Sequence, residues 1–222
     1  MKAIHGAWLA RVQRGVMIIV AAMLLLPPGL AAARSVQPTG NKTVLVLGDS
    51  LSAAYGLQAS QGWVALTTQR MRGTHPGWRL VNASISGETT SGGASRASAE
   101  ITRTQPAVVV IELGANDGLR GLALAQTRAN LDQIIRAAKA ANAKVLLIGM
   151  RLPPNFGPQY THAFEQIYVD LARQHGTTFL PFLLAPIAAD RKAFQADNMH
   201  PTAQVQPKLR DHVWRLLQPL LK

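Results

Sequence analysis

The sequence has 222 residues, of which 48% are apolar and 15% charged, with 23 Lys and Arg, 11 Asp and Glu and no Cys. This length is sufficient for one domain with a sizeable core. The lack of Cys excludes thiol nucleophiles, disulfides, thiolate-bound zinc and iron–sulfur clusters, so covalent catalysis would need another side chain. The formal charge of +12 leaves two interpretations open, a polyanionic partner or a solvated basic surface.

The N-terminal residues have the pattern of a secretory signal. Lys2, Arg11 and Arg14 precede an apolar run at 16–26, which is followed by Pro-Pro-Gly and then by three alanines. The apolar run is too short to cross a bilayer as a helix. We therefore expect a signal peptide at 1–33, cleaved after Ala33, then a short linker at 34–41 and a periplasmic or secreted domain at 42–222. The alternative is an uncleaved membrane anchor, which the Pro-Pro-Gly break disfavours. Cleavage removes three basic residues and lowers the net charge from +12 to +9.

Short apolar runs alternate with longer amphipathic segments in the rest of the chain. Strands are predicted at 43–47, 78–83, 107–113 and 144–150, with a weaker one at 177–180. The strong runs are continuously apolar, as in a parallel sheet that is covered on both faces. Apolar residues at offsets of 0, 3, 4 and 7 predict helices over 131–138 and 164–171, and a similar C-terminal pattern predicts a helix that starts near Pro207. The alternation predicts a single α/β domain with a parallel sheet.

Polar residues follow each predicted strand. In open α/β sheets, ligands and catalytic groups gather beyond the carboxyl ends of the strands. Five of the 11 acidic residues lie in or beside the blocks that follow the strands here, which favours one site over a scattered surface. The blocks are Gly-Asp-Ser-Leu-Ser at 48–52, the stretch 82–89, Gly-Ala-Asn-Asp at 114–117, the stretch 151–157, and Asp-Asn-Met-His-Pro at 197–201.

These blocks contain the groups that acyl transfer to a hydroxyl requires. A serine is a weak nucleophile that needs a hydrogen-bonded base, and a carboxylate can orient an imidazole for that task. Ser50, His200 and Asp197 match these roles, and one turn can hold Asp197 beside His200. The backbone N–H groups of Ser50 and Gly87 and the side-chain amide of Asn116 are candidate donors to an oxyanion.

Each block also has a structural interpretation. A Gly-Asp-Ser sequence after a strand is often a helix cap, and Asp49 and Asp117 are expected to brace loops rather than to react. Residues 87–93 are rich in Gly but lack the Lys of a phosphate-binding loop. The other histidines lack an acid in the Asp-x-x-His arrangement. No His, Asp or Glu cluster has the spacing of metal ligands, so neither a metal nor a cofactor is expected.

Taken together, the ordered blocks resemble the GDSL, or SGNH, hydrolase family. The stretches at 81–87, 112–121 and 151–155 are most similar to its bacterial thioesterase I, lysophospholipase L1 and arylesterase subgroup. The resemblance implies Ser50 as the nucleophile, Asp197 and His200 as the rest of a triad, and Gly87 and Asn116 as oxyanion donors. It also implies a flavodoxin-like three-layer α/β/α sandwich with a five-stranded parallel sheet in the order 2-1-3-4-5.

Two stretches qualify the resemblance. Residues 198–199 are Asn-Met where the subgroup usually has Gly-Ile. In the subgroup, the loop that matches 151–160 lies beside the acyl site and moves with substrate, which implies that Leu152, Pro153, Asn155 and Phe156 contact substrate. The alternative is that this loop is only a crossover.

We therefore expect an exported serine esterase that hydrolyses small or medium acyl esters and thioesters, with lysophospholipids among the candidate substrates, through an acyl-enzyme. A competing hypothesis is a basic module that binds nucleic acid or an anionic surface, but the basic residues form no dense run and aromatic residues are few. A catalytically inactive relative is disfavoured because no motif residue is missing. We expect a monomer with no nucleic-acid partner and no stable membrane anchor after cleavage.

Overall fold

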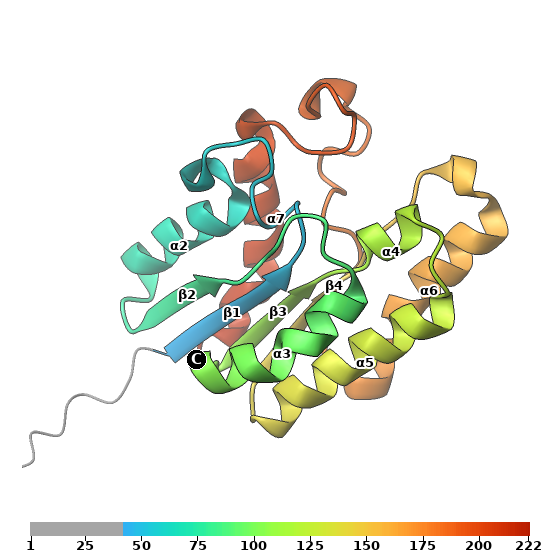
Figure 1. The fold of residues 1–222 in the computed structure, drawn as a ribbon. Helices are drawn as coiled ribbons and strands as arrows, with labels where there is room; N and C mark the ends of the chain where they lie inside the picture. Colours follow the sequence, from blue (N-terminus) through green and yellow to red (C-terminus); the bar gives the residue numbers. More distant parts are fainter. Residues whose placement is uncertain (1–41) are drawn as a thin grey trace, which may run out of the picture. The chain divides into compact units, whose positions relative to one another are not determined.

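The fold is described for residues 42–222 in a computed structural model. The predicted signal peptide at 1–33 and the linker at 34–41 lie outside the described residues. Five parallel strands form one sheet in the order β2-β1-β3-β4-β5, as predicted (Figure 1). The strands are β1 (Lys42–Gly48), β2 (Trp78–Asn82), β3 (Val108–Glu112), β4 (Lys144–Ile148) and β5 (Thr178–Leu180), and their ends differ from the predicted ones by at most two residues.

The central strands are buried on both faces. In β1 every residue after Lys42 is buried, and all of β3 is buried. Val44 pairs with Val108 at the start of this ladder, and Gly48 pairs with Glu112 at its end. Burial on both faces explains why these strands are continuous apolar runs.

Helices cover both faces of the sheet. One face carries α2 (Trp63–Thr74) and α7 (Gln206–Leu217), and the other carries α3 (Thr90–Thr104), α5 (Leu124–Ala140) and α6 (Pro158–His175) (Figure 1). This arrangement confirms the three-layer sandwich. A short helix, α4 (Ala115–Leu119), follows β3, and five short 3₁₀ turns complete the described chain: η1 (Ala59–Gln61), η2 (Pro154–Phe156), η3 (Arg191–Ala193), η4 (Ala203–Val205) and η5 (Gln218–Leu220).

The predicted helical stripes face the core. Leu131, Ile134 and Ile135 of α5 are fully buried, and Phe164 and Leu171 are fully buried in α6. The helix α7 has Pro207 in its first turn, where the missing N–H of proline costs nothing. Within residues 42–222, no helix combines the length and the apolar character that a bilayer crossing needs.

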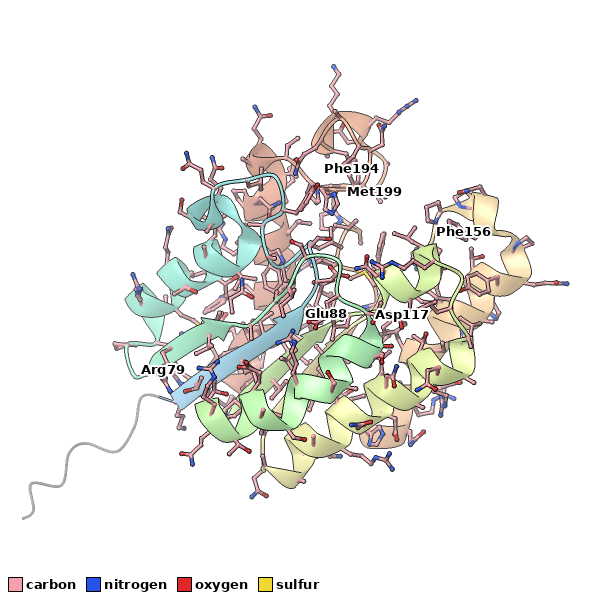
Figure 2. The ribbon with its side chains drawn as sticks, viewed as in Figure 1. Arg79, Glu88, Asp117, Phe156, Phe194 and Met199 are labelled. Carbon is pink, nitrogen blue, oxygen red and sulfur yellow. The ribbon has the colours of Figure 1, made fainter. Side chains whose placement is uncertain are left out.

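The parallel strands bring the polar blocks to one edge of the sheet. All five strands point the same way, so the loops that follow them share the edge at their carboxyl ends. Figure 2 shows Glu88, Asp117 and Met199 towards this end, whereas Arg79 lies near the opposite end of the sheet. This carboxyl edge is where the candidate site forms.

Candidate active site

The loop after β1 holds Ser50 in a tight turn. Asp49 is fully buried, and its Oδ1 accepts a hydrogen bond from the Leu51 N–H at 3.0 Å. The backbone N–H of Ala53 donates to the Asp49 carbonyl at 2.9 Å. Asp49 therefore braces this loop, as expected, and Ser50 stays partly exposed beside it.

A hydrogen-bonded relay connects Ser50 to the C-terminal part of the chain. The Oγ of Ser50 lies 2.9 Å from Nε2 of His200, and Nδ1 of His200 lies 2.7 Å from Oδ2 of Asp197. With the ring proton on Nδ1 and directed to Asp197, Nε2 is free to accept the proton of the serine hydroxyl. The three residues predicted from the sequence are thus placed in the order that activates a serine.

Asp197 is held by the turn that it precedes. Its Oδ1 accepts hydrogen bonds from the backbone N–H groups of Met199 at 2.9 Å and of His200 at 3.0 Å. Partial burial raises its pKa, but these two bonds and the bond from the His200 ring outweigh it and bring the pKa of Asp197 to about 2. Asp197 is therefore ionised at neutral pH and can stabilise an imidazolium.

The Asn at 198, where the subgroup usually has Gly, is compatible with the backbone of this turn. Asn198 has a φ of 57°, in the left-handed region that glycine prefers. Among the other residues, Asn tolerates this conformation best because its short polar side chain can bond locally. Asn198 therefore adopts the left-handed conformation that a glycine would favour at this position.

One candidate oxyanion donor, Asn116, contacts the neighbours in sequence of the other two, Ser50 and Gly87. Among residues 42–222, the backbone N–H groups of Ser50 and Gly87 have no protein acceptor. The Nδ2 of Asn116 lies 3.0 Å from the Glu88 carbonyl oxygen and 3.3 Å from Oδ2 of Asp49. An oxyanion would therefore have to share or replace one of these two acceptors of Asn116.

A second buried acid, Asp117, supports the neighbouring loops. Its Oδ2 accepts from the backbone N–H of Thr90 at 2.8 Å, and its Oδ1 accepts from the Thr90 hydroxyl. Thr127 of α5 also donates to Oδ1, at 3.3 Å. Asp117 therefore joins the start of α3 to α4 and α5 and takes no part in the relay, as expected.

The predicted substrate loop divides into buried and exposed parts. Leu152 is only 8% exposed and packs against Gly118 of α4, so its side chain supports the protein core. Pro153 and Asn155 are exposed. Phe156 is half-buried, with its ring 6.4 Å from that of Tyr160, and Figure 2 places it at the same end of the molecule as Met199. The side chain of Leu152, which was predicted to contact substrate, is thus almost entirely buried.

The same edge carries large apolar side chains that were not predicted to contact substrate. The large apolar residues that are exposed among residues 42–222 all lie at this edge: Tyr55, Ile85, Leu119, Leu122 and Met199. The ring of Tyr55 lies 4.4 Å from that of His200, between centroids. The signal in the sequence was a large apolar residue within a polar strand-end block or up to five residues after it.

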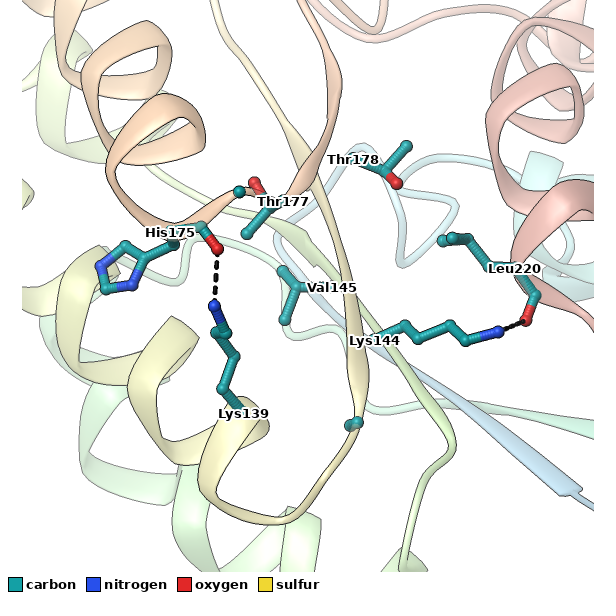
Figure 3. Close-up of a pocket in the computed structure, with 9 residues that line it drawn as sticks. Lys139, Lys144, Val145, His175, Thr177, Thr178 and Leu220 are labelled. Carbon is teal, nitrogen blue, oxygen red and sulfur yellow. Dashed lines mark hydrogen bonds between the residues drawn. The ribbon is translucent and has the colours of Figure 1, made fainter.

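A cavity of about 200 Å³ lies at the amino end of the sheet, away from Ser50 (Figure 3). Two lysines of its lining donate to carbonyl groups near helix ends, Lys139 to His175 at 2.6 Å and Lys144 to Leu220 at 3.1 Å. The ring of His175 also lies 2.6 Å from Oδ1 of Asp132, an acid–imidazole pair that sequence spacing did not reveal. The two lysine contacts cap helix termini, and all three contacts are separate from the relay.

A second cavity, of about 340 Å³, lies between α2 and β2, and Ser52 and Arg72 are part of its lining. Neither Ser50 nor His200 lines either cavity. Within residues 42–222, no three His, Asp or Glu side chains are grouped so that they could hold a metal ion.

Known proteins resemble this chain over most of its length. The model of the GDSL-like lipase/acylhydrolase family matches residues 46–206. The chain is 48% identical to esterase TesA of Pseudomonas aeruginosa, over 89% of this chain and 98% of that protein. It is 42% identical to thioesterase 1/protease 1/lysophospholipase L1 of Escherichia coli K12, over 81% and 85%. The crystal structure of esterase EstA from Pseudoalteromonas, inhibited by monoethylphosphonate, superimposes with a TM-score of 0.77 at 38% identity, over 81% and 98%.

Proposed function

The chain belongs to the GDSL-like lipase/acylhydrolase family, and from this we infer that it hydrolyses carboxylic esters and thioesters through an acyl-enzyme on Ser50. The observation that carries the proposal is the relay of 2.9 Å from Ser50 Oγ to His200 and 2.7 Å from His200 to Asp197. Similar proteins with esterase and thioesterase in their names support the same reaction class.

The relay suits the first half of the reaction. Ser50 Oγ attacks the carbonyl carbon while its proton passes to Nε2 of His200, and Asp197 stabilises the imidazolium that forms. The carbonyl oxygen becomes an oxyanion, for which the N–H groups of Ser50 and Gly87 and the amide of Asn116 are the proposed donors. When the C–O or C–S bond breaks, the alcohol or thiol leaves with the proton from His200.

The second half repeats these steps with water. His200 accepts a proton from a water molecule, and the resulting hydroxide attacks the acyl carbon of the Ser50 ester. The carboxylic acid leaves when Ser50 Oγ recovers the proton from His200. Every proton in this cycle is transferred through Nε2 of His200, which requires the contact of this nitrogen with Ser50.

The surroundings of Ser50 favour substrates with an apolar part. Tyr55, Ile85, Leu119, Leu122 and Met199 are exposed at the carboxyl edge, and Phe156 is half-buried there. Apolar side chains with a few convergent polar groups are typical of small-molecule sites. We therefore propose acyl esters and thioesters as substrates, with lysophospholipids among them and Pro153, Asn155 and Phe156 as contacts.

Labelling with a fluorophosphonate tests the assignment of the nucleophile. The wild-type chain should take up the label on Ser50, and Ser50→Ala should lose it. Ser52→Ala, two residues away, should still become labelled to completion, because the reacting hydroxyl is intact. A label retained by Ser50→Ala would exclude Ser50 as the nucleophile. A panel of p-nitrophenyl esters and acyl-CoA thioesters of increasing chain length then identifies the preferred substrate.

We further propose that residues 1–33 direct export and are removed, which leaves the hydrolase domain at 42–222 behind a short linker. The support is the basic start, the short apolar run and the three alanines that end at Ala33. In a Gram-negative host, the chain recovered from the periplasm should begin at Arg34. A chain that keeps Met1 and stays in the membrane fraction would instead indicate an uncleaved anchor.

A further inference from the structure

A fully buried acid lies next to the loop that carries Ser50. Glu112 is the last residue of β3, pairs with Gly48 at the end of β1 and is 0% exposed. Among residues 42–222, no Lys, Arg or His forms an ion pair with it. Because a buried carboxylate without a cation is costly, the position of Glu112 calls for an explanation.

The contacts of Glu112 lie on both sides of Ser50. Its Oε2 is 2.5 Å from the Oγ of Ser52, and it accepts a longer hydrogen bond of 3.4 Å from the backbone N–H of Asp49. Asp49 precedes Ser50 directly, and Ser52 follows it by two residues. One carboxyl group on a central strand therefore holds the nucleophile loop on either side of the reacting hydroxyl.

The surroundings of Glu112 favour its neutral form. Its Oε1 has no hydrogen-bond partner among the described residues, and its nearest acidic neighbour, Asp49, is also fully buried. Burial first, and then the charge of Asp49, raise the pKa of Glu112 well above its ordinary value. In the protonated carboxyl, Oε2 is the carbonyl oxygen that accepts from the Ser52 hydroxyl and from the Asp49 N–H, and Oε1 carries the proton. An unpartnered neutral hydroxyl at Oε1 costs less than an unpartnered buried charge.

We propose that Glu112 is a positioning residue for the nucleophile, and that it works as a neutral carboxylic acid that holds Asp49 and Ser52 on the two sides of Ser50. The proposal rests on the proposed function. It gives Glu112 no contact with substrate, because its side chain is completely covered.

The neutral Glu112 leaves Asp49 free to carry a negative charge. Asp49 Oδ2 lies 3.3 Å from Nδ2 of Asn116, so Asp49 links the nucleophile loop to a candidate oxyanion donor. Apart from each other, the titratable groups that act on the two carboxyls are Asp117, His200 and Tyr168. With Glu112 neutral, only Asp49 of these two neighbouring buried acids carries a charge, so repulsion between two carboxylates is avoided.

Two substitutions separate the charge of Glu112 from its contacts. Glu112→Gln keeps the shape and the hydrogen bonds but cannot ionise, whereas Glu112→Ala removes the contacts. For a p-nitrophenyl ester, Glu112→Gln should keep kcat within about threefold of the wild type, with the same pH profile between pH 6 and 9. Glu112→Ala should lower kcat by about tenfold or more and change KM by less than about twofold. The matched control is Glu100→Gln on α3, because Glu100 is a partly exposed acid that pairs with Arg103. This substitution should change neither constant.

Each alternative outcome would overturn the proposal. If Glu112→Gln and Glu112→Ala have equal melting temperatures and lose the same share of kcat, catalysis needs a carboxylate at this position. The neutral role of Glu112 is then wrong. If Glu112→Ala keeps the wild-type kcat, Glu112 positions nothing.

If Glu112→Ala does not fold, Ser52→Ala removes one of the two contacts instead. The rate of fluorophosphonate labelling should then fall by about threefold or more, and an unchanged rate would overturn the proposal. Failure of the proposed function is distinguishable, because it would appear as a label that Ser50→Ala retains.

Discussion

The Nε2 of His200 lies 2.9 Å from the Oγ of Ser50, although 150 residues separate them in the sequence. The contact joins a loop after the first strand to a loop after the last strand of the sheet. These two strands are not neighbours, since β3 and β4 lie between β1 and β5. The long loop between β5 and α7 therefore has to return over the carboxyl edge to bring His200 to Ser50, and this return completes the relay.

Asp197→Asn tests the carboxylate of the relay. An Asn side chain can still accept the backbone bonds that Asp197 receives from Met199 and His200, but it carries no charge and can favour the wrong tautomer of His200. We expect kcat for a p-nitrophenyl ester to fall by about 1000-fold or more with a small change in melting temperature. Asp170→Asn, on the exposed surface of α6, should leave kcat unchanged. A kcat within tenfold of the wild type for Asp197→Asn would exclude it from the triad.

Asn116→Ala tests the side-chain donor to the oxyanion. A donor that acts mainly in the transition state lowers kcat by about 100- to 1000-fold when it is removed, while KM changes little. Steady-state kinetics on one ester measure both constants. The protein has to remain folded for this comparison, which circular dichroism can verify. An unchanged kcat would show that Asn116 serves only to join Asp49 to the Glu88 carbonyl.

The buried Glu112 predicts a loss of stability as the pH rises. Its pKa in the folded state is raised well above the ordinary 4.5, so between these two values the folded state binds more protons than the unfolded state. The free energy of unfolding should then fall by about 1.4 kcal/mol for each pH unit in this interval, relative to Glu112→Gln. Thermal melts from pH 4 to 9 should show the melting temperature of Glu112→Gln rising relative to that of the wild type. A difference that stays constant with pH would contradict a raised pKa.

Gly114→Ala should destabilise the loop that leads to Asn116. Gly114 has a φ of 117°, and a Cβ there would lie 2.0 Å from the Oη of Tyr168, which donates to the Leu113 carbonyl. We expect a loss of about 3 kcal/mol, because left-handed strain and overpacking add. The control is Gly73→Ala in α2, where a Cβ meets no atom within 4 Å. Urea unfolding of both variants measures the effect, and equal midpoints would contradict the prediction.

Local sequence pointed to Ser50 and His200, whose side chains the structure brings into contact. Ser50, Asn116 and His200 each lie directly beyond a strand or in a short motif, and the parallel sheet gathers such positions at one edge. The prediction was weaker where side-chain direction matters. Leu152 was expected to contact substrate but is buried against Gly118, whereas Asn155 is exposed, and the sequence of a loop does not report which of its side chains face the core.

The sequence by itself determined the five strands, the helices α5, α6 and α7 with their buried faces, and the polar blocks that follow the strands, whereas α2, α3 and α4 were not predicted. It could do so because burial on both faces makes a strand continuously apolar, and because one helical face repeats every three to four residues. Only the tertiary structure decided that Glu112 contacts Ser52, that Asn116 reaches Asp49, and that His175 pairs with Asp132. Each of these contacts depends on how strands and helices lie against one another, which no local pattern of residues reports.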